Sequence, residues 1–195
     1  MAQTQNTGRT RERNNNRSKL LTDSIYIALF AAVIAICAQI RLPIGPIPFT
    51  LQTLGIFLAG GLLGAKKGTI SVLIYILLGA VGVPVFNGFS GGPGVLFGVT
   101  GGYIIGFIFT ALVVGIASDH RKKKIWILIA AMVVGEILCY AFGTAWYIIL
   151  MNSQGNATGL WAALSSCVIP FLIPDAAKIA VSVIIINRLN KIIKI

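Results

Sequence analysis

The sequence predicts an all-α integral membrane protein, built as a bundle of six transmembrane helices. Of its 195 residues, 56% are hydrophobic and only 11% are charged, whereas a soluble domain carries about 25% charged residues. Apolar stretches recur along the chain, and a helical span takes about 20 such residues. Basic residues gather in short patches beside these stretches. A chain of this length therefore has room for about six spans and for no separate soluble domain.

Each predicted helix is an apolar stretch bounded by charged residues, glycine or proline. Helices are expected at residues 22–40, 49–64, 68–82, 101–118, 125–151 and 174–190, with a short apolar segment at 160–169. Residues 1–19 are polar and basic and lack an apolar core. They predict a disordered cytoplasmic arm rather than a cleavable signal peptide. Residues 20–195 are then expected to form a single membrane domain.

The placement of positive charge predicts the orientation. Of the 16 Lys and Arg residues, all but Arg41 and Lys178 precede the first helix, follow the last, or lie in the second or fourth loop. With six spans these segments share one side of the membrane, and basic loops are retained in the cytoplasm. Both termini are therefore predicted to be cytoplasmic. The net charge of +11 is interpreted as a topology signal and as contact with lipid headgroups, not as nucleic-acid binding.

The stretch 84–106, PVFNGFSGGPGVLFGVTGGYIIG, has eight glycines in 23 residues between apolar segments. Glycine and proline at this density do not continue a spanning helix. Irregular backbone near a membrane survives in water, packed on protein, or lining a cavity. We expect this external stretch to form a lid or wall over a small-molecule site, with an ordinary external loop as the alternative.

The two remaining basic residues, Arg41 and Lys178, lie on the predicted external half of the protein. Asp175 and Lys178 stand three residues apart, so they share one face of the last helix. Charges at membrane depth cost several kcal/mol unless paired or wetted, which makes them functional candidates. The alternative is a self-paired helix start after Pro174. Glu136 is interpreted as an interhelical hydrogen-bonding group or as a further site residue.

Other polar and aromatic residues reach the same side. Three prolines stiffen residues 41–52, which deliver Thr50 and Gln52 to the start of the second helix. Tyr140, Trp146 and Tyr147 form either an aromatic belt at the membrane interface or a wall for a ring.

Catalytic and metal chemistry is not indicated. Cys37, Cys139 and Cys167 lie far apart in apolar stretches and are interpreted as buried thiols. The single histidine, His120, falls in a predicted cytoplasmic loop. Residues 61–68, GLLGAKKG, lack the spacing of a phosphate-binding loop, so no ATPase is expected in this chain.

Several motifs, taken in order, closely resemble the BioY family, the biotin-specific substrate-capture subunits (S components) of energy-coupling-factor vitamin transporters. They are TLQ at 50–52, LAGGLLG at 58–64, Tyr75 with GAVGVPVF at 79–86, SGGPG at 90–94, GVTGGY at 98–103 and PDAAK at 174–178. Each motif alone is weak, but the ordered set is specific and covers about residues 22–190. One departure is Val99, where the pattern leads us to expect proline.

The resemblance implies a high-affinity biotin pocket near the external face of a bacterial plasma-membrane protein that is not an enzyme and needs no cofactor. It also implies partners: a transmembrane coupling subunit and two cytoplasmic ATPases. Small residues on the first helix would dock the coupling subunit. Two A-x-x-x-A pairs are present there, Ala28/Ala32 and Ala31/Ala35. Packing within the chain's own bundle is the alternative for these alanines.

Biotin also fits the polar residues. Its ureido ring needs acceptors and a donor, its carboxylate needs a cation or backbone N–H groups, and its ring and chain need aromatic walls. Which end of biotin faces the charged pair is left open. The expected substrate-binding residues are Asp175, Lys178, Asn87, Tyr103, Gln52, Thr50, Arg41, Phe86, Gly91, Gly92, Gly94 and Tyr147.

A second class of transporter remains an alternative. In a stand-alone, ion-gradient-driven carrier for a small carboxylate-bearing solute, Glu136 and Asp175 would be the coupling carboxylates. The sequence shows no internal repeat of the kind found in many such carriers.

Overall fold

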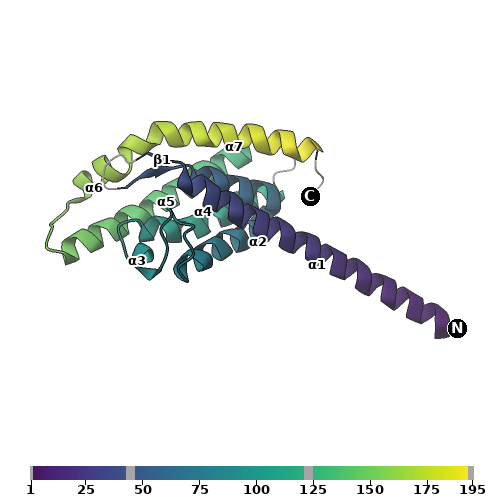
Figure 1. Ribbon diagram of the computed structural model, residues 1–195. Coiled ribbons are helices and arrows are strands. Elements are labelled where there is room, and N and C mark those ends of the chain that lie inside the picture. The colour runs from purple at the N-terminus through teal and green to yellow at the C-terminus, as the bar shows by residue number, and fades with distance from the viewer. Residues whose placement is uncertain (1, 43–46, 121–124, 193–195) are drawn as a thin grey trace.

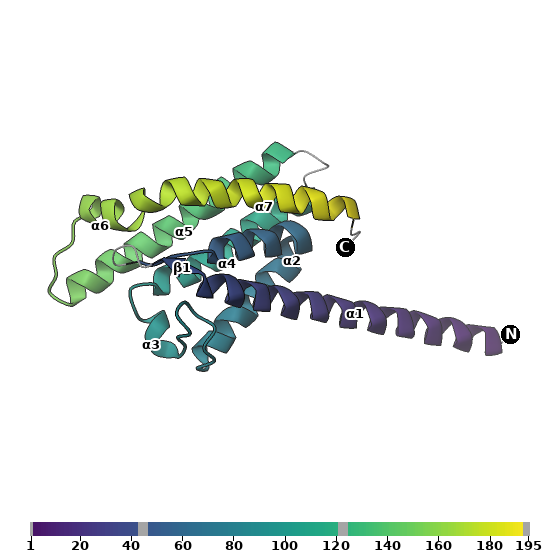
Figure 2. The same cartoon turned by 45° about the horizontal axis from the view of Figure 1, so that its top comes forward.

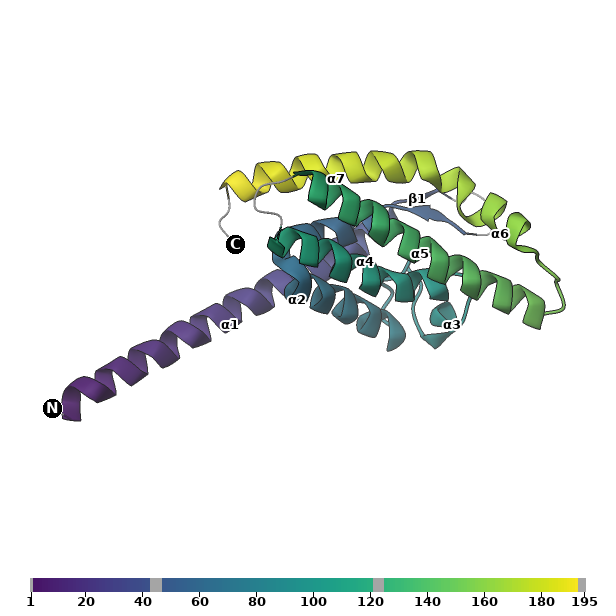
Figure 3. The same ribbon diagram turned by 180° about the vertical axis from the view of Figure 1, so that it is seen from behind.

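The structure, a computed structural model, describes residues 2–42, 47–120 and 125–192 and is mostly helical (Figure 1). Its elements are α1 (Ala2–Gln39), β1 (Arg41–Leu42), β2 (Phe49–Thr50), α2 (Gln52–Ala80), α3 (Pro93–Leu96), α4 (Gly101–His120), α5 (Ile125–Ser153), α6 (Leu160–Cys167), the 3-10 turn η1 (Ile169–Phe171) and α7 (Leu172–Ile192). The short helices α3 and α6 lie at one end of the bundle, and both chain ends lie toward the other (Figures 1 and 3).

Helix α2 is a helical hairpin, which reconciles it with the two helices predicted at 49–64 and 68–82. Gly64 has φ +78° and ψ −179°, a conformation that only glycine adopts readily. Two contacts show that the chain reverses there. Gln52 Nε2 reaches Tyr75 Oη at 2.6 Å, and a Cβ on Gly68 would lie 2.8 Å from Cα of Gly60. Figure 2 shows the two parts of α2 running in different directions.

The end of α4 holds this reversal in place. Ser118 Oγ donates to the carbonyl of Gly61 at 2.6 Å, and the amide of Ala65 donates to Asp119 Oδ2 at 3.0 Å. These backbone groups stand at the end of one helical arm and the start of the next, where helices leave carbonyls and amides without internal partners. The two side chains therefore cap both arms at once.

Among the described residues, five helical segments are long and apolar enough to cross a membrane: Arg17–Gln39, Gln52–Ala80, Gly101–His120, Ile125–Ser153 and Leu160–Lys191. The expectation of a multi-pass helical membrane protein is thereby confirmed. The two arms of α2, which the prediction of six spans counted separately, are counted together as one of these five segments. Six spans and the cytoplasmic placement of both termini stay predictions.

Helix α1 begins earlier than the sequence analysis placed it. The structure has it start at Ala2 rather than near residue 22, so the segment expected to be a disordered arm continues the helix. No proline interrupts residues 2–19, which leaves nothing to stop the helix there. The N-terminal part of α1 projects away from the bundle (Figure 1). The division into arm and membrane domain stays a prediction.

Residues 41–42 and 49–50, at the two sides of the proline-containing loop, are extended, as the sequence predicts. Its described parts pair as an antiparallel ribbon, with Arg41 opposite Thr50 and Leu42 opposite Phe49. Residues 43–46 and the basic loop 121–124 lie outside the described residues.

Glycines allow the helices of the bundle to pack closely. A Cβ on Gly60 would lie 2.8 Å from the carbonyl oxygen of Ala111, and one on Gly106 would lie 2.9 Å from Cα of Cys139. The first contact joins α2 to α4, and the second joins α4 to α5. Small residues at such crossings let helix backbones approach closely in lipid. This packing brings the ends of α2, α4, α5 and α7 together around the site.

Candidate binding site

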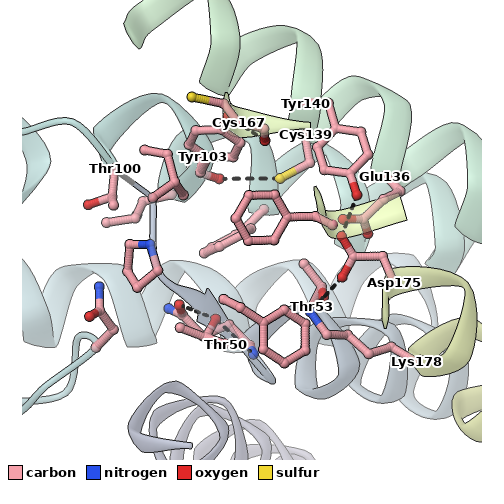
Figure 4. A pocket seen from close by; sticks show the side chains of 18 of the residues that line it. Thr50, Thr53, Thr100, Tyr103, Glu136, Cys139, Tyr140, Cys167, Asp175 and Lys178 are labelled. Atoms are coloured by element: carbon pink, nitrogen blue, oxygen red, sulfur yellow. Dashed lines mark hydrogen bonds and ion pairs between the residues drawn. The ribbon is translucent and has the colours of Figure 1, made fainter. Parts of the chain in front are cut away.

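A cavity of about 600 Å³, counting its part open to solvent, lies among β2, α2, α4, α5 and α7 (Figure 4). Its lining is Ile47, Pro48, Phe49, Thr50, Gln52, Thr53, Phe86, Asn87, Thr100, Tyr103, Ile104, Phe107, Glu136, Cys139, Tyr140, Cys167, Phe171, Asp175 and Lys178.

A buried ion pair stands at one side of the cavity. Lys178 Nζ lies 2.6 Å from Asp175 Oδ1, and the two residues are only 6% and 5% exposed. Lys178 also donates to Thr53 Oγ1 at 3.1 Å, and the hydroxyl of Tyr140 donates to Asp175 Oδ2. Buried pairs persist when further hydrogen bonds offset their loss of water, and this pair has them on both sides. Asp175 and Lys178 therefore pair with each other, as in the alternative interpretation of a self-paired helix start. Both residues also line the cavity.

An aromatic ring covers the ammonium group. Lys178 Nζ lies 4.1 Å from the centroid of the Phe49 ring, and Phe49 stacks on Phe171 at a centroid distance of 6.4 Å. A cation over an aromatic face is attracted by the ring's electron density, more strongly when water is excluded. The charged group therefore has one polar side, toward Thr53 and Asp175, and one aromatic side.

Glu136 belongs to the same cluster. It is 5% exposed, lines the cavity, and precedes Tyr140 by one turn of α5. Figure 4 shows it beside Tyr140 and Asp175. Among the described residues its Oε2 is buried without a hydrogen-bond partner. Glu136 therefore lines the cavity, and a role in ligand binding stays a prediction.

Thr50 and Gln52 line the cavity from β2 and α2, as predicted. The hydroxyl of Thr50 donates to Gln52 Oε1 at 2.8 Å, and Gln52 Nε2 donates to Tyr75 Oη at 2.6 Å. This chain of hydrogen bonds fixes the Gln52 amide between the two arms of α2.

The apolar wall comes from the glycine-rich stretch and from α4. Phe86 is 1% exposed and meets Tyr75 edge-on at 5.5 Å between centroids. Tyr103 donates its hydroxyl to the carbonyl of Cys167 at 3.3 Å. Asn87 and Thr100 add polar groups to the same wall. The expectation that this stretch forms a cavity wall is confirmed for these residues.

Five of the expected ligand contacts do not line the cavity: Arg41, Gly91, Gly92, Gly94 and Tyr147. Arg41 is exposed and instead points at Asn87, with Nη1 3.4 Å from Oδ1. The amide of Gly92 is already bound to the carbonyl of Gly79 at 2.7 Å, so that it is not free for a carboxylate.

Several lining residues were not among the sequence candidates. Thr53 and Phe49 contact Lys178, and Phe171 stacks on Phe49, yet nothing in the spacing of these residues marks them. Thr53 directly follows Gln52, and Phe49 is one of many aromatic residues in the chain. Only the packing of α7 against α2 and β2 brings them to the ammonium group.

The alanines of α1 divide between two faces. Ala28 and Ala32 are exposed, as are the larger Ile25 and Leu29 beside them. Ala31 is 3% exposed and packs inside the bundle, so the structure corrects its assignment to a docking face. Ala35 is half-buried. The alternative of packing within the chain thus holds for Ala31.

A helical membrane protein with a preformed cavity, walled by aromatic rings and carrying a buried ion pair, has the features of a small-solute transport protein. The chain belongs to the BioY family, whose sequence profile matches residues 8–195. The resemblance found in the sequence is thereby confirmed. The protein is a multi-pass membrane protein of a transporter family and not an enzyme.

Relatives from distant organisms support this membership. The chain is 40% identical over 168 residues to the "Biotin transporter BioY" of Thermotoga maritima, covering 86% of this chain and 95% of that protein. It is 35% identical over 183 residues to the "Biotin transporter BioY" of Lactococcus lactis subsp. cremoris, covering 91% and 94%.

A solved structure has the same fold. The crystal structure of "the S-component for biotin from an ECF-type ABC transporter" aligns with a TM-score of 0.78 at 33% identity, covering 91% of this chain and 94% of that one.

Proposed function

We propose that this chain is the biotin-binding S component of an ATP-driven, energy-coupling-factor type transporter and captures biotin from the external side. The names of its relatives support biotin as the ligand. The observation that carries the proposal is the Asp175–Lys178 pair, which is buried, held by Tyr140 and Thr53, and part of the cavity lining.

The chemistry of the site favours one orientation of the ligand. Asp175 and Lys178 offer an acceptor and a donor side by side, which matches the N–H and C=O groups of a ureido ring. Glu136 adds a second carboxyl group to the single ammonium, so a third carboxylate would be unfavourable here. We therefore infer that the ureido ring faces the ion pair and that the carboxylate faces the opening. Phe86 and Tyr103 are then positioned to cover the thioether ring and chain.

The same proposal includes six spans with both termini in the cytoplasm. Phe49, Phe86 and Phe171 line the cavity. Lys66 lies at the opposite end of the first arm of α2 from the cavity, and Arg188 lies at the opposite end of α7. Lysine and arginine favour the cytoplasmic side, which would leave the cavity toward the outside.

ATP-driven transport by this chain would need partner subunits that bind ATP, because residues 61–68 lack the spacing of a phosphate-binding loop. We infer that a transmembrane coupling subunit docks on the exposed Ala28/Ala32 face of α1 and that two cytoplasmic ATPases supply the energy. Two small residues four apart allow a partner helix to approach closely.

Isothermal titration of the detergent-purified protein with biotin tests the binding step, with thiamine as a matched control vitamin. Tight binding of biotin alone is expected. A protein that is folded but binds no biotin would overturn the proposal.

Uptake into vesicles separates this proposal from the alternative of an ion-gradient-driven carrier. That alternative is considered because Glu136 and Asp175 line the same cavity. Uptake that needs ATP and partner subunits is expected. Uptake by this chain alone, abolished by an uncoupler, would favour the carrier instead.

A further inference from the structure

Residues 85–90, here named the cap turn, cover one side of the cavity. The amide of Phe86 donates to the carbonyl of Ser90 at 3.0 Å and closes the turn. Phe86 and Asn87 face the cavity, while Phe89 is exposed and has φ +56°. A positive φ is uncommon for a bulky residue, so neighbouring groups must hold this turn in shape.

Gln39, the last residue of α1, is the side chain that holds it. Gln39 Nε2 lies 3.2 Å from the carbonyl oxygen of Val85 and 3.1 Å from that of Phe86, and it also bonds Ala35 O at 3.2 Å. Gln39 Oε1 accepts the amide of Phe89 at 2.9 Å. Among the described residues, no other hydrogen bond reaches the Val85 and Phe86 carbonyls. One amide side chain therefore satisfies three backbone groups of the turn.

Arg41 adds a weaker contact from the same end of α1. Its guanidinium packs on Gly88, where a Cβ would lie 2.5 Å from Nη1, and it approaches Asn87 Oδ1 at 3.4 Å. The cap turn has its own link to α2, because Phe86 packs against Tyr75. Within the described part of the chain, Gln39 at the end of α1 and Arg41 in β1 supply the side chains from outside the turn that bond it.

We propose that Gln39 is a positioning residue that keeps the cap turn closed over the cavity and thereby sets how long the ligand stays bound. It does not line the cavity, so its action passes through Phe86 and Asn87. Ligand exit requires space at one wall, and opening this wall requires breaking the bonds that Gln39 makes. The ligand named here rests on the proposed function, whereas the mobility of the turn does not.

The test compares Gln39→Met, which keeps the length of the side chain but cannot make these bonds, with Gln39→Ala. Biotin association and dissociation rates are measured by rapid mixing on the full chain in detergent. Both variants are expected to release biotin about tenfold faster, since each net hydrogen bond contributes a factor of a few to about ten. The association rate is expected to change much less. Arg41→Met should have a smaller effect.

Hydrogen exchange of the ligand-free protein decides the same point without biotin. Exchange within residues 84–92 should accelerate in both Gln39 variants and stay unchanged elsewhere. Thr22→Ala is the control, because it removes an exposed hydrogen bond to Ser18 from the same helix.

Wild-type release and wild-type exchange in Gln39→Met would overturn the proposal, because packing rather than hydrogen bonding would then hold the turn. Acceleration spread over the whole chain would also overturn it, by showing a general loss of stability. A wild-type protein that binds no biotin would instead refute the proposed function, and the exchange result would still decide the role of Gln39.

Discussion

Removing one member of the Asp175–Lys178 pair should weaken both biotin binding and the stability of the protein. In Asp175→Asn or Lys178→Met, the remaining charge stays buried without its partner at 2.6 Å. Leaving such a charge unpaired costs about 3–5 kcal/mol of folding free energy. The ligand also loses a charge-assisted hydrogen bond, which contributes about 1.5–3 kcal/mol. Affinity for biotin should therefore fall by about 10- to 150-fold.

The double variant Asp175→Asn/Lys178→Met makes the test sharp. It leaves neither charge unpaired, so thermal unfolding should recover toward that of the wild type. Biotin binding should not recover, because both ligand contacts are gone. Calorimetry on the three purified variants, with unfolding followed in the same detergent, gives both quantities. Unchanged affinity in the two single variants would remove the pair from the site, and recovery of binding in the double variant would show that only stability was at stake.

Three further outcomes are expected from small changes of volume. Gly64→Ala should lower the unfolding temperature well below that of Gly155→Ala, because both glycines have positive φ but only Gly64 lies against a neighbouring carboxylate; equal shifts would contradict the close fit at the hairpin. Gly79→Ala should displace the buried phenylalanine of the cavity wall and weaken biotin binding, whereas Gly94→Ala, with open space around it, should not. Ala32→Leu should abolish uptake by vesicles containing the partner subunits and leave biotin affinity unchanged; retained uptake would remove Ala32 from the docking face.

Much of the architecture could be predicted because the signals are local. Hydropathy marks a span within its own residues, and glycine and proline mark its interruptions. Thus the predicted break between residues 64 and 68 coincides with the reversal at Gly64. The structure starts α1 at Ala2 rather than near residue 22, in a polar segment that contains no proline.

The site could be predicted only in part. Asp175 and Lys178 share a helical face by spacing alone, and the structure confirms that they lie together in the cavity. Arg41 has the charge expected of a ligand contact and lies near the cavity end of α1, yet its side chain points at Asn87 and does not itself line the cavity. Charge and approximate position do not determine the direction of a side chain.

The sequence by itself determined that this protein is a helical membrane protein of the BioY family, because composition, periodicity and ordered motifs are properties of neighbouring residues. Only the tertiary structure decided which groups meet. Thr53 bonds Lys178 across 125 positions, and Gln39 bonds the cap turn across 46 to 50. No local pattern encodes such contacts, since they depend on how separate helices pack against one another.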